Sequence, residues 1–267
     1  HGSVPYFTRK NLVKKIFDVL IGKSILKNAS ILVAETEVGV DEYIDLDRTI
    51  NRDEIVVLSP PFDTDEYIQL PKKGDFRKKY NILPSEKVVS FLGRVHYIKG
   101  NDFLIKGFAE FVKHDQHSRL VIIGPDDGHM TECKKIVIDL NIEDKVIFTG
   151  FLGGEYKNSA LVDSDIVVQL SRQEQGAWAP LEAVLCETPI VVTDHTGTGE
   201  DIKRMDAGYL VTFDDVMGLS NIFSEIFNNY DLAMDKTLRA KQHIEQNLSF
   251  NCRVEEYIDI YNNCIRK

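Results

Sequence analysis

Cysteine is scarce in this chain of 267 residues, and its four copies form no metal-binding pattern. None of them lies in a C-x2-C pair, and none has histidines at zinc-finger spacing. The pattern therefore excludes a zinc-stabilised module and offers no framework for a disulfide-stapled secreted domain. A reduced, cytoplasmic protein is expected.

Positive charge and long apolar runs are also in short supply. Lysine and arginine number 32 against 42 aspartates and glutamates, a formal net charge of −10. Such a surface repels phosphate backbones, so a general nucleic-acid partner is not expected and any anionic ligand must be bound locally. No apolar run approaches the ~18 residues of a membrane span, and the first residues lack a charged-then-apolar signal pattern.

The first 27 residues are the exception to this acidic character. They hold six basic residues against one aspartate, Asp18, a net charge of +5. Residues 11–26 space their apolar side chains as an amphipathic helix with a basic face. Two interpretations follow: a helix packed by its apolar face with the basic face in water, or peripheral docking at the inner face of the membrane.

From Lys87 onward, short runs of β-branched and apolar residues alternate with helical segments. The runs lack strict polar alternation, which is typical of strands covered on both faces. Between the first two runs, Leu104, Phe108 and Phe111 have the spacing of a buried helical stripe. We predict an α/β fold, a Rossmann-like parallel sheet with helices on both faces. The predicted strands are 88–93, 120–124, 146–150, 166–170, 189–193 and 208–211.

Three predicted strands end in glycine, at Gly93, Gly124 and Gly150, on the edge where parallel sheets bind their ligands. Arg94 and Lys99 follow the first of these glycines and flank a turn that leads into the next helix. Two cations beside a helix N-terminus favour an anion, because backbone N–H groups and the helix dipole add to the side-chain charges. The alternative is that both side chains are merely solvated in a polar loop.

Two carboxylates, Glu174 and Glu182, bracket a second junction between a predicted strand and a helix. A carboxylate in the first turns of a helix is favoured by the dipole alone, which is the structural explanation for Glu182. Carboxylates also accept paired hydrogen bonds from vicinal diols. The cations and the carboxylates together predict a pocket that binds phosphate at one end and a polyol at the other. A nucleotide sugar contains both groups.

The same segments resemble a known family. "FLGRVHYIKGNDFLIKGF", "LVIIGPDDG", "VIFTGFL" and "DIVVQLSRQEQGAWAPLEAVLCETPIVVTDHTGTGEDI" are similar, in order and spacing, to the retaining glycosyltransferases of family 4. Glu174 and Glu182 fit the E-x7-E motif of that family. The resemblance implies the C-terminal half of a two-Rossmann-domain (GT-B type) enzyme that needs no metal and takes a UDP- or GDP-sugar as donor.

The resemblance also implies roles for single residues. Arg94 and Lys99 look like the pair that grips the donor diphosphate, Glu182 like the ribose-binding carboxylate, and Glu174 like the carboxylate that faces the transferred sugar. His1 resembles a strand-end histidine near that sugar, or else belongs to a cloning remnant. The candidate catalytic residues are thus Glu174, Arg94, Lys99 and His1. The candidate donor-binding residues are Gly93, Arg94, Lys99, Gly124, Phe151, Gly176, Ala177, Trp178, Ala179 and Glu182.

The chain departs from the family pattern at Gln175, where a glycine usually follows the first glutamate, and this leaves the sugar undecided. Two D-x-D sequences, 63–65 and 163–165, match the metal-binding pattern of other glycosyltransferases, but we interpret both as chance matches. The expected acceptor is a sugar or a lipid-linked molecule in glycan, lipid or cell-envelope polysaccharide synthesis. Two alternatives remain: an epimerase or hydrolase on the same scaffold, and a non-catalytic module that binds nucleotide sugar.

Two further candidate strands, 31–36 and 55–60, precede a segment rich in proline and charge, 59–75, that is typical of an interdomain linker. We therefore predict three parts. Residues 1–75 are the tail of the N-terminal, acceptor-side domain with the linker. Residues 76–245 are the C-terminal Rossmann-like domain that binds the nucleotide sugar, and residues 246–267 are a helix that packs back on the N-terminal part.

Overall fold

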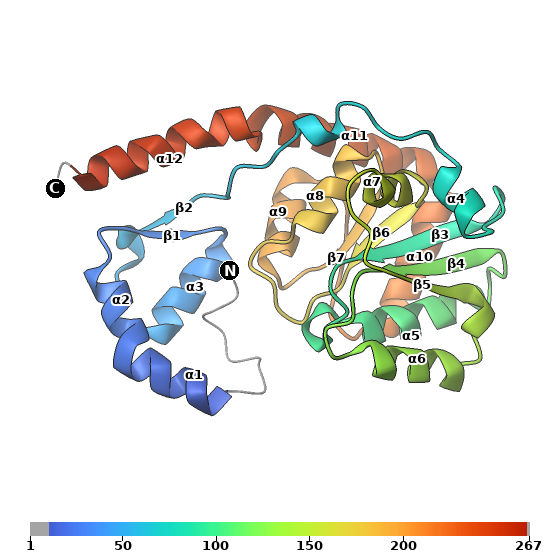
Figure 1. The fold of residues 1–267 in the computed structure, drawn as a ribbon, viewed down its shortest axis with the longest axis horizontal. Coiled ribbons are helices and arrows are strands. Elements are labelled where there is room, and N and C mark those ends of the chain that lie inside the picture. The colour runs from blue at the N-terminus through green and yellow to red at the C-terminus, as the bar shows by residue number, and fades with distance from the viewer. Residues whose placement is uncertain (1–10, 266–267) are drawn as a thin grey trace.

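The computed structural model describes residues 11–265, which form a large parallel sheet, a small parallel sheet and the helices around them (Figure 1). The strands are β1 (Leu32–Ala34), β2 (Ile55–Val57), β3 (Lys87–Leu92), β4 (Ser118–Ile123), β5 (Val146–Gly150), β6 (Ile166–Gln169), β7 (Ile190–Thr193) and β8 (Tyr209–Val211). The α-helices are α1 (Asn11–Phe17), α2 (Lys23–Asn28), α3 (Glu37–Leu46), α4 (Asp75–Lys79), α5 (Asn101–Val112), α6 (Met130–Asp139), α7 (Glu155–Val162), α8 (Trp178–Leu185), α9 (Gly197–Met205), α10 (Val216–Asn228), α11 (Tyr230–Asn247) and α12 (Phe250–Ile265).

The large sheet has the strand order β5-β4-β3-β6-β7-β8, and all of its pairs are parallel. Successive residues of a strand point to opposite faces, and here both faces are apolar. In β3, for example, Val89 and Phe91 belong to the core on one face and Val88 to the core on the other. Each of the six predicted strands overlaps one of β3 to β8, so the predicted sheet is confirmed.

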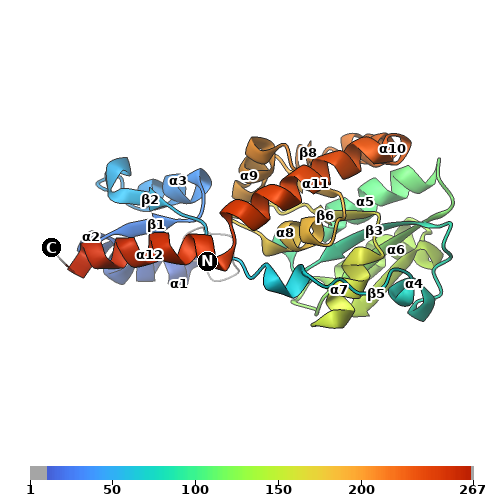
Figure 2. The ribbon, with the colours of Figure 1, turned by 90° about the horizontal axis from the view of Figure 1, so that it is seen from above.

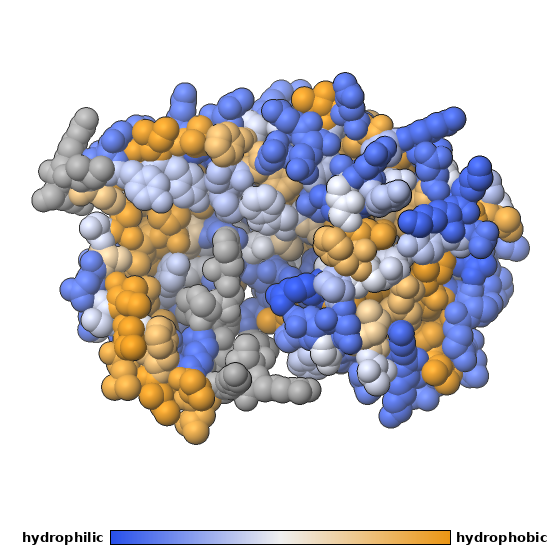
Figure 3. Space-filling model, viewed as in Figure 1, coloured by the Kyte–Doolittle hydropathy of each residue, from blue (hydrophilic) through white to orange (hydrophobic). Residues whose placement is uncertain are grey.

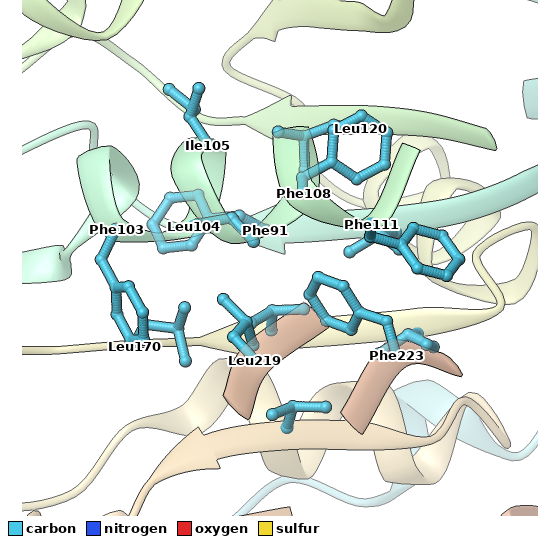
Figure 4. Packing of buried hydrophobic residues seen from close by; sticks show 14 of the residues in the cluster. Phe91, Phe103, Leu104, Ile105, Phe108, Phe111, Leu120, Leu170, Leu219 and Phe223 are labelled. Atoms are coloured by element: carbon cyan, nitrogen blue, oxygen red, sulfur yellow. The ribbon is translucent and has the colours of Figure 1, made fainter. Parts of the chain in front are cut away.

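Helices cover both faces of this sheet. On one face α5, α6 and α10 pack over the strands, and on the other α7, α8, α9 and α11 do so. Figure 4 shows the first of these cores, where Phe111 of α5 meets Phe223 of α10 edge to face, with ring centroids 5.7 Å apart. Phe108, predicted from its helical spacing, is fully buried there. The prediction of helices on both faces is confirmed.

The N-terminal unit, which we define as residues 11–58, is much smaller. β1 and β2 pair in parallel, and α3 packs against them over a core of five buried residues. These residues are Leu32, Ala34, Val40, Ile50 and Ile55. The predicted amphipathic helix consists of α1, a π-helical turn (Asp18–Gly22) and α2.

Nothing in the described part of the chain, residues 11–265, covers the apolar face of α1, the π-helical turn and α2. Leu12 and Leu20 are 72% and 71% exposed, and the apolar side chains gather at one corner of the surface, over these helices (Figure 3). The interpretation that this face is packed is therefore wrong for the described residues. No helix among residues 11–265 has the length and apolar character needed to cross a membrane.

The last two helices, α11 and α12, lead from the large domain, by which we mean the large sheet with its covering helices, to the N-terminal unit. α11 packs on the large domain, and α12 continues alongside β1 and β2 (Figures 1 and 2). Two contacts hold the crossing: the Phe62 N–H donates to the Leu248 carbonyl at 3.0 Å, and the Tyr257 hydroxyl donates to the Leu58 carbonyl at 3.2 Å. The chain therefore passes between the two regions twice, once near Phe62 and once near Leu248.

The D-x-D sequence at residues 163–165 has a structural role. The buried Asp163 carboxylate accepts hydrogen bonds from the backbone N–H groups of Gly74 (2.5 Å) and Arg77 (3.0 Å). The neighbouring Asp165 pairs with the Arg77 guanidinium at 2.8 Å and accepts from the Val88 N–H at 2.7 Å. These contacts fasten the end of the linker to the large domain.

Candidate functional site

The strand order of the large sheet reverses between β3 and β6. Ligands of open α/β sheets bind at such a switch point, outside the carboxyl ends of the strands. The turn after β3 carries Arg94 and Lys99, and the loop after β6 carries Glu174. The topology thus brings the predicted phosphate-binding turn and the first glutamate of the E-x7-E motif to the same place.

Glycine at position 124 allows the strand ends to lie close together. Gly124 has a φ of +148°, and a Cβ built on it would lie 1.8 Å from the Gly93 carbonyl oxygen. Its N–H donates to the Gly150 carbonyl at 2.9 Å, so the ends of β3, β4 and β5 meet here. A side chain at position 124 would push the turn bearing Arg94 away from the sheet.

Lys99 and Glu174 form an ion pair across the switch point. Both side chains are largely buried, and the Ser171 hydroxyl donates to the same Glu174 oxygen at 3.3 Å. Arg94 lies apart from this pair: its side chain is 65% exposed and donates to the Asp127 carboxylate at 2.5 Å. The two predicted diphosphate cations are therefore each paired with a carboxylate, one inside the site and one at its rim.

An arginine and an aspartate join the two loops of the site. Arg172 donates to both carboxylate oxygens of Asp102, at 2.9 and 2.6 Å, and its guanidinium lies 3.7 Å from the centre of the Tyr97 ring. Burial raises the pKa of Asp102, but the hydrogen bonds and charge of Arg172 outweigh it, and the pKa lies below its usual range. The loop after β6 is thus fixed to the start of α5, directly after the turn that holds Lys99.

Glu182 lies one turn into α8, as predicted, and is held by a lysine from α7. The Lys157 ammonium donates to the Glu182 carboxylate at 2.9 Å and to the Tyr67 hydroxyl at 3.1 Å. Burial raises the pKa of Tyr67, and the charge of Glu182 raises it further, so this hydroxyl stays protonated. Glu182 therefore lies in a separate cluster from Lys99 and Glu174.

The segment between the two glutamates is braced by the start of α9. The Ala177 N–H donates to the Thr198 hydroxyl at 2.8 Å, and the Gly197 N–H donates to the Glu174 carbonyl at 2.8 Å. Trp178 begins α8, and its ring centre lies 5.0 Å from that of Phe62. The amides from Gly176 to Ala179 thus lie between the site and the crossing near Phe62.

A cavity of about 300 Å³ lies on the crossing side of this segment. Gly176, Ala177 and Trp178 line it, together with Glu35, Asp201 and Arg253, whereas the Lys99–Glu174 pair does not. Burial raises the pKa of Glu35, and the negative charge of Glu174 raises it as well. Glu35 therefore brings a carboxylate from the N-terminal unit close to the site.

The remaining predicted residues are placed as follows. Phe151 follows β5 and is 75% exposed, and Ala179 is partly buried in the first turn of α8. His1 lies outside the described residues. The sequence analysis did not predict five residues of the site: Lys157, Arg172, Asp102, Thr198 and Glu35. Two signals were available: the Gly-Thr-Gly run at 197–199 for Thr198, and the end of a predicted strand for Glu35.

The family model for glycosyl transferases group 1 matches residues 72–243. This chain belongs to the glycosyl transferases group 1. The match includes both the turn after β3 and the two glutamates, so the family predicted from these segments is confirmed.

This group 1 chain is similar in sequence to two curated enzymes, among others. It is 29% identical over 182 residues to mannosylfructose-phosphate synthase of Agrobacterium fabrum, covering 65% of this chain and 39% of that protein. It is 25% identical over 230 residues to D-inositol 3-phosphate glycosyltransferase of Nocardia farcinica, covering 83% of this chain and 50% of that protein. The chain therefore spans half or less of the length of these two relatives.

Solved structures of glycosyltransferases share the fold. HepE of Anabaena, in complex with UDP and glucose, matches with a TM-score of 0.82 at 18% identity, over 96% of this chain and 68% of that one. Sucrose-phosphate synthase of Thermosynechococcus elongatus matches with a TM-score of 0.81 at 19% identity, over 99% of this chain and 66% of that one. The prediction of a GT-B type fold is confirmed by these likenesses.

Proposed function

We propose that this chain is the donor-binding part of a retaining glycosyltransferase that moves a sugar from a UDP- or GDP-sugar to an acceptor hydroxyl. The observation that carries the proposal is the Lys99–Glu174 pair at the switch point of a group 1 fold. A cation and a carboxylate at this edge match the two ends of a sugar diphosphate, which needs charge neutralisation at one end and hydroxyl recognition at the other.

The proposed roles follow from these positions. Lys99 and Arg94 bind the diphosphate, the former inside the site and the latter from its rim. Glu174 faces the transferred sugar, and Glu182 accepts hydrogen bonds from the ribose hydroxyls. The amides of residues 176–179, with Gly93, Gly124 and Phe151, complete the donor site.

The difficult step is departure of the charged diphosphate from the anomeric carbon, which leaves an oxocarbenium-like centre. Preorganised positive charge stabilises the developing charge on the diphosphate. We propose that Lys99 and Arg94 provide it, and that the acceptor hydroxyl attacks from the face that the diphosphate leaves and gives its proton to a phosphate oxygen. Retention of anomeric configuration follows from this geometry.

UDP is favoured as the nucleotide because HepE of Anabaena, which has the same fold, was solved with UDP and with UDP-glucose. We also propose that residues 76–245 form the donor-binding domain, that residues 1–75 belong to the acceptor side, and that residues 246–267 pack back on that side. The open apolar face of α1 and α2, next to Lys15 and Lys23, supports peripheral contact with an anionic membrane on the cytoplasmic side. A lipid-linked acceptor of cell-envelope synthesis would fit such a location.

Calorimetry with UDP and with uridine tests the diphosphate assignment. Lys99→Ala and Arg94→Ala should each weaken UDP binding by about 1.5–3 kcal/mol, roughly ten- to a hundredfold, while uridine binding stays unchanged. Lys135→Ala is the matched control, because Lys135 is an exposed lysine on α6, away from the switch point. Equal losses for UDP and uridine would show that the two cations do not bind phosphate.

Incubation with a UDP-sugar alone separates the proposed transferase from its rivals. Free or epimerised sugar in the absence of acceptor would favour the hydrolase or epimerase. UDP binding without any reaction in a full-length version of the protein would favour a non-catalytic module. Transfer to an acceptor with retained configuration, read by NMR of the product, is the expected result.

A further inference from the structure

The loop that carries Glu174 turns its side chains in two directions. Glu174 points toward Lys99, whereas its neighbours Gln173 and Gln175 reach the opposite way, to one carboxylate on the N-terminal unit. That carboxylate belongs to Glu42 of α3. Alternation of this kind is typical of an extended segment, in which successive side chains point to opposite sides.

Glu42 uses both of its oxygens in this contact. The Gln173 side-chain amide donates to Oε1 at 2.5 Å, and the Gln175 side-chain amide donates to Oε2. The carbonyl oxygen of the Gln173 side chain is buried and has no hydrogen-bond partner within residues 11–265. In the described part of the chain, Glu42 is therefore the group that fixes the Gln173 side chain.

The backbone of the loop is held from the same side. The Thr36 hydroxyl, directly before α3, donates to the Gln175 carbonyl at 3.1 Å. Gly39 of α3 is buried beneath the Gln175 side chain, since a Cβ at position 39 would lie 3.7 Å from the Gln175 Cδ atom. A shift of α3 relative to the large domain would thus move residues 173–175.

We propose that Glu42 is a positioning residue, which uses Gln173 and Gln175 to hold the Glu174 carboxylate at the switch point. The proposal rests on the proposed function only for the consequence of that position, which is the rate of sugar transfer. Hydrogen bonds to a charged acceptor are among the stronger ones in proteins, and two of them restrict the loop more than one. The side-chain hydrogen bonds of Glu42 go to Gln173 and Gln175, whereas Lys99 pairs with Glu174, so the effect of Glu42 passes through the loop.

The substitutions separate hydrogen bonding from general structure. Glu42→Ala removes both acceptors. Glu42→Gln retains both bonds, because its carbonyl accepts from Gln173 and the Gln175 amide can rotate to present its own carbonyl. Asp45→Ala is the control, since Asp45 is an exposed carboxylate on the same helix.

Trp178 reports the state of the loop without any reaction. It is the single tryptophan of the 267 residues and lies three positions after Gln175. We expect acrylamide to quench its fluorescence more strongly in Glu42→Ala than in the unchanged chain, and equally in the unchanged chain, Glu42→Gln and Asp45→Ala. Unaltered quenching in Glu42→Ala, or an equal rise in Asp45→Ala, would overturn the proposal.

Kinetics in a full-length version of the protein test the consequence for transfer. Glu42→Ala should lower kcat about ten- to a hundredfold, as small misplacements of reacting groups do. KM for the UDP-sugar and the affinity for UDP should stay unchanged, because Lys99 and Arg94 are intact. An equal loss of kcat in Glu42→Gln, or a loss of UDP affinity in Glu42→Ala, would overturn the proposal. Absence of UDP binding and transfer in the unchanged protein would instead contradict the proposed function, and the quenching result would still decide the role of Glu42.

Discussion

The large domain and the N-terminal unit are built from the same parts, parallel strands joined by helices, yet they differ in size and in how far their apolar faces are covered among the described residues. The large sheet is covered on both faces, and every strand except β5 contributes buried residues to its cores. The N-terminal unit has two strands and five buried core residues, and among residues 11–265 the apolar face of α1 and α2 has no cover. Since two strands rarely form a stable structure alone, the small sheet depends, within residues 11–265, on its neighbours in a way that the large sheet does not.

Substitutions in the two cores should show the largest difference in stability between the large domain and the N-terminal unit. Phe108→Ala should lower the free energy of unfolding by about 3–5 kcal/mol, because Phe108 is fully buried in the large core. Ile55→Ala should leave the main transition nearly unchanged and open only the N-terminal unit, which unfolds locally. Urea unfolding followed by circular dichroism measures the first effect, and limited proteolysis within residues 11–58 the second.

Ile138→Ala is the control, since Ile138 is an exposed apolar residue on α6. Equal shifts of the main transition by Phe108→Ala and Ile55→Ala would mean that the two regions unfold as one body.

The two D-x-D sequences sharpen the comparison at the linker. Asp163→Asn should cost about 2–3 kcal/mol of stability, because an amide replaces a buried acceptor of two backbone N–H groups. Asp63→Asn should change stability by less than about 0.5 kcal/mol, because Asp63 is exposed. Thermal unfolding of both variants measures the difference. Equal losses of stability in Asp163→Asn and Asp63→Asn would contradict this prediction, because the buried hydrogen bonds of Asp163 would then make no difference.

The pH dependence of stability tests the boundary between the large domain and the N-terminal unit. The pKa of Asp201 is raised from 3.8 to about 6, chiefly by burial; the charges of Arg204 and Arg253 lower it, and those of Glu200 and Glu35 raise it. A raised pKa in an acid means that the folded protein binds this proton more tightly than the unfolded chain does. Stability from this group therefore falls as the pH rises between about 4 and about 6, and the loss is complete above that range, where the folded protein contains the buried carboxylate in its charged form.

Asp201→Asn should accordingly stabilise the protein near pH 7.5, and its advantage should shrink by about 1.4 kcal/mol near pH 5. Chemical denaturation of both proteins at the two pH values gives this difference, in which the other carboxylates cancel. An advantage independent of pH would show that Asp201 is ionised normally in the fold.

Tyr257→Phe is the smallest test, at the crossing of α12. The change removes the hydrogen bond to the Leu58 carbonyl and should cost about 1 kcal/mol or less. We expect faster proteolysis of residues 11–58 with an unchanged main transition. Tyr261→Phe is the control, since Tyr261 is an exposed tyrosine on the same helix. A lowered main transition in Tyr257→Phe alone would couple α12 to the large domain.

The strands and helices of the large domain could be predicted because each depends on the pattern of apolar residues within its own short segment. Continuous apolar runs such as residues 166–170 indicate strands covered on both faces, and the spacing of Leu104, Phe108 and Phe111 indicated the helix that the structure has as α5. The proximity of Arg94, Lys99 and Glu174 to one sheet edge followed from parallel topology alone. These features depend on periodicity and chain direction, both of which the sequence contains.

The pairings between side chains could not be predicted. Glu42 meets Gln175 across 133 positions, and Lys157 meets Glu182 across 25, without any spacing that indicates contact. The sequence left two interpretations of the apolar face of α1 and α2 open for a related reason, because amphipathic spacing shows which side chains are apolar but not what covers them.

The contact between Tyr257 and Leu58 joins residues that are 199 positions apart. On the ribosome, a chain is made from its N-terminus, and domains fold as they emerge. β1 and β2 leave the ribosome before the large domain, whereas α12, which lies alongside them, leaves after it. The large domain therefore completes its sheet while the N-terminal unit is still without α12, so β1 and β2 are made early but reach their final packing late.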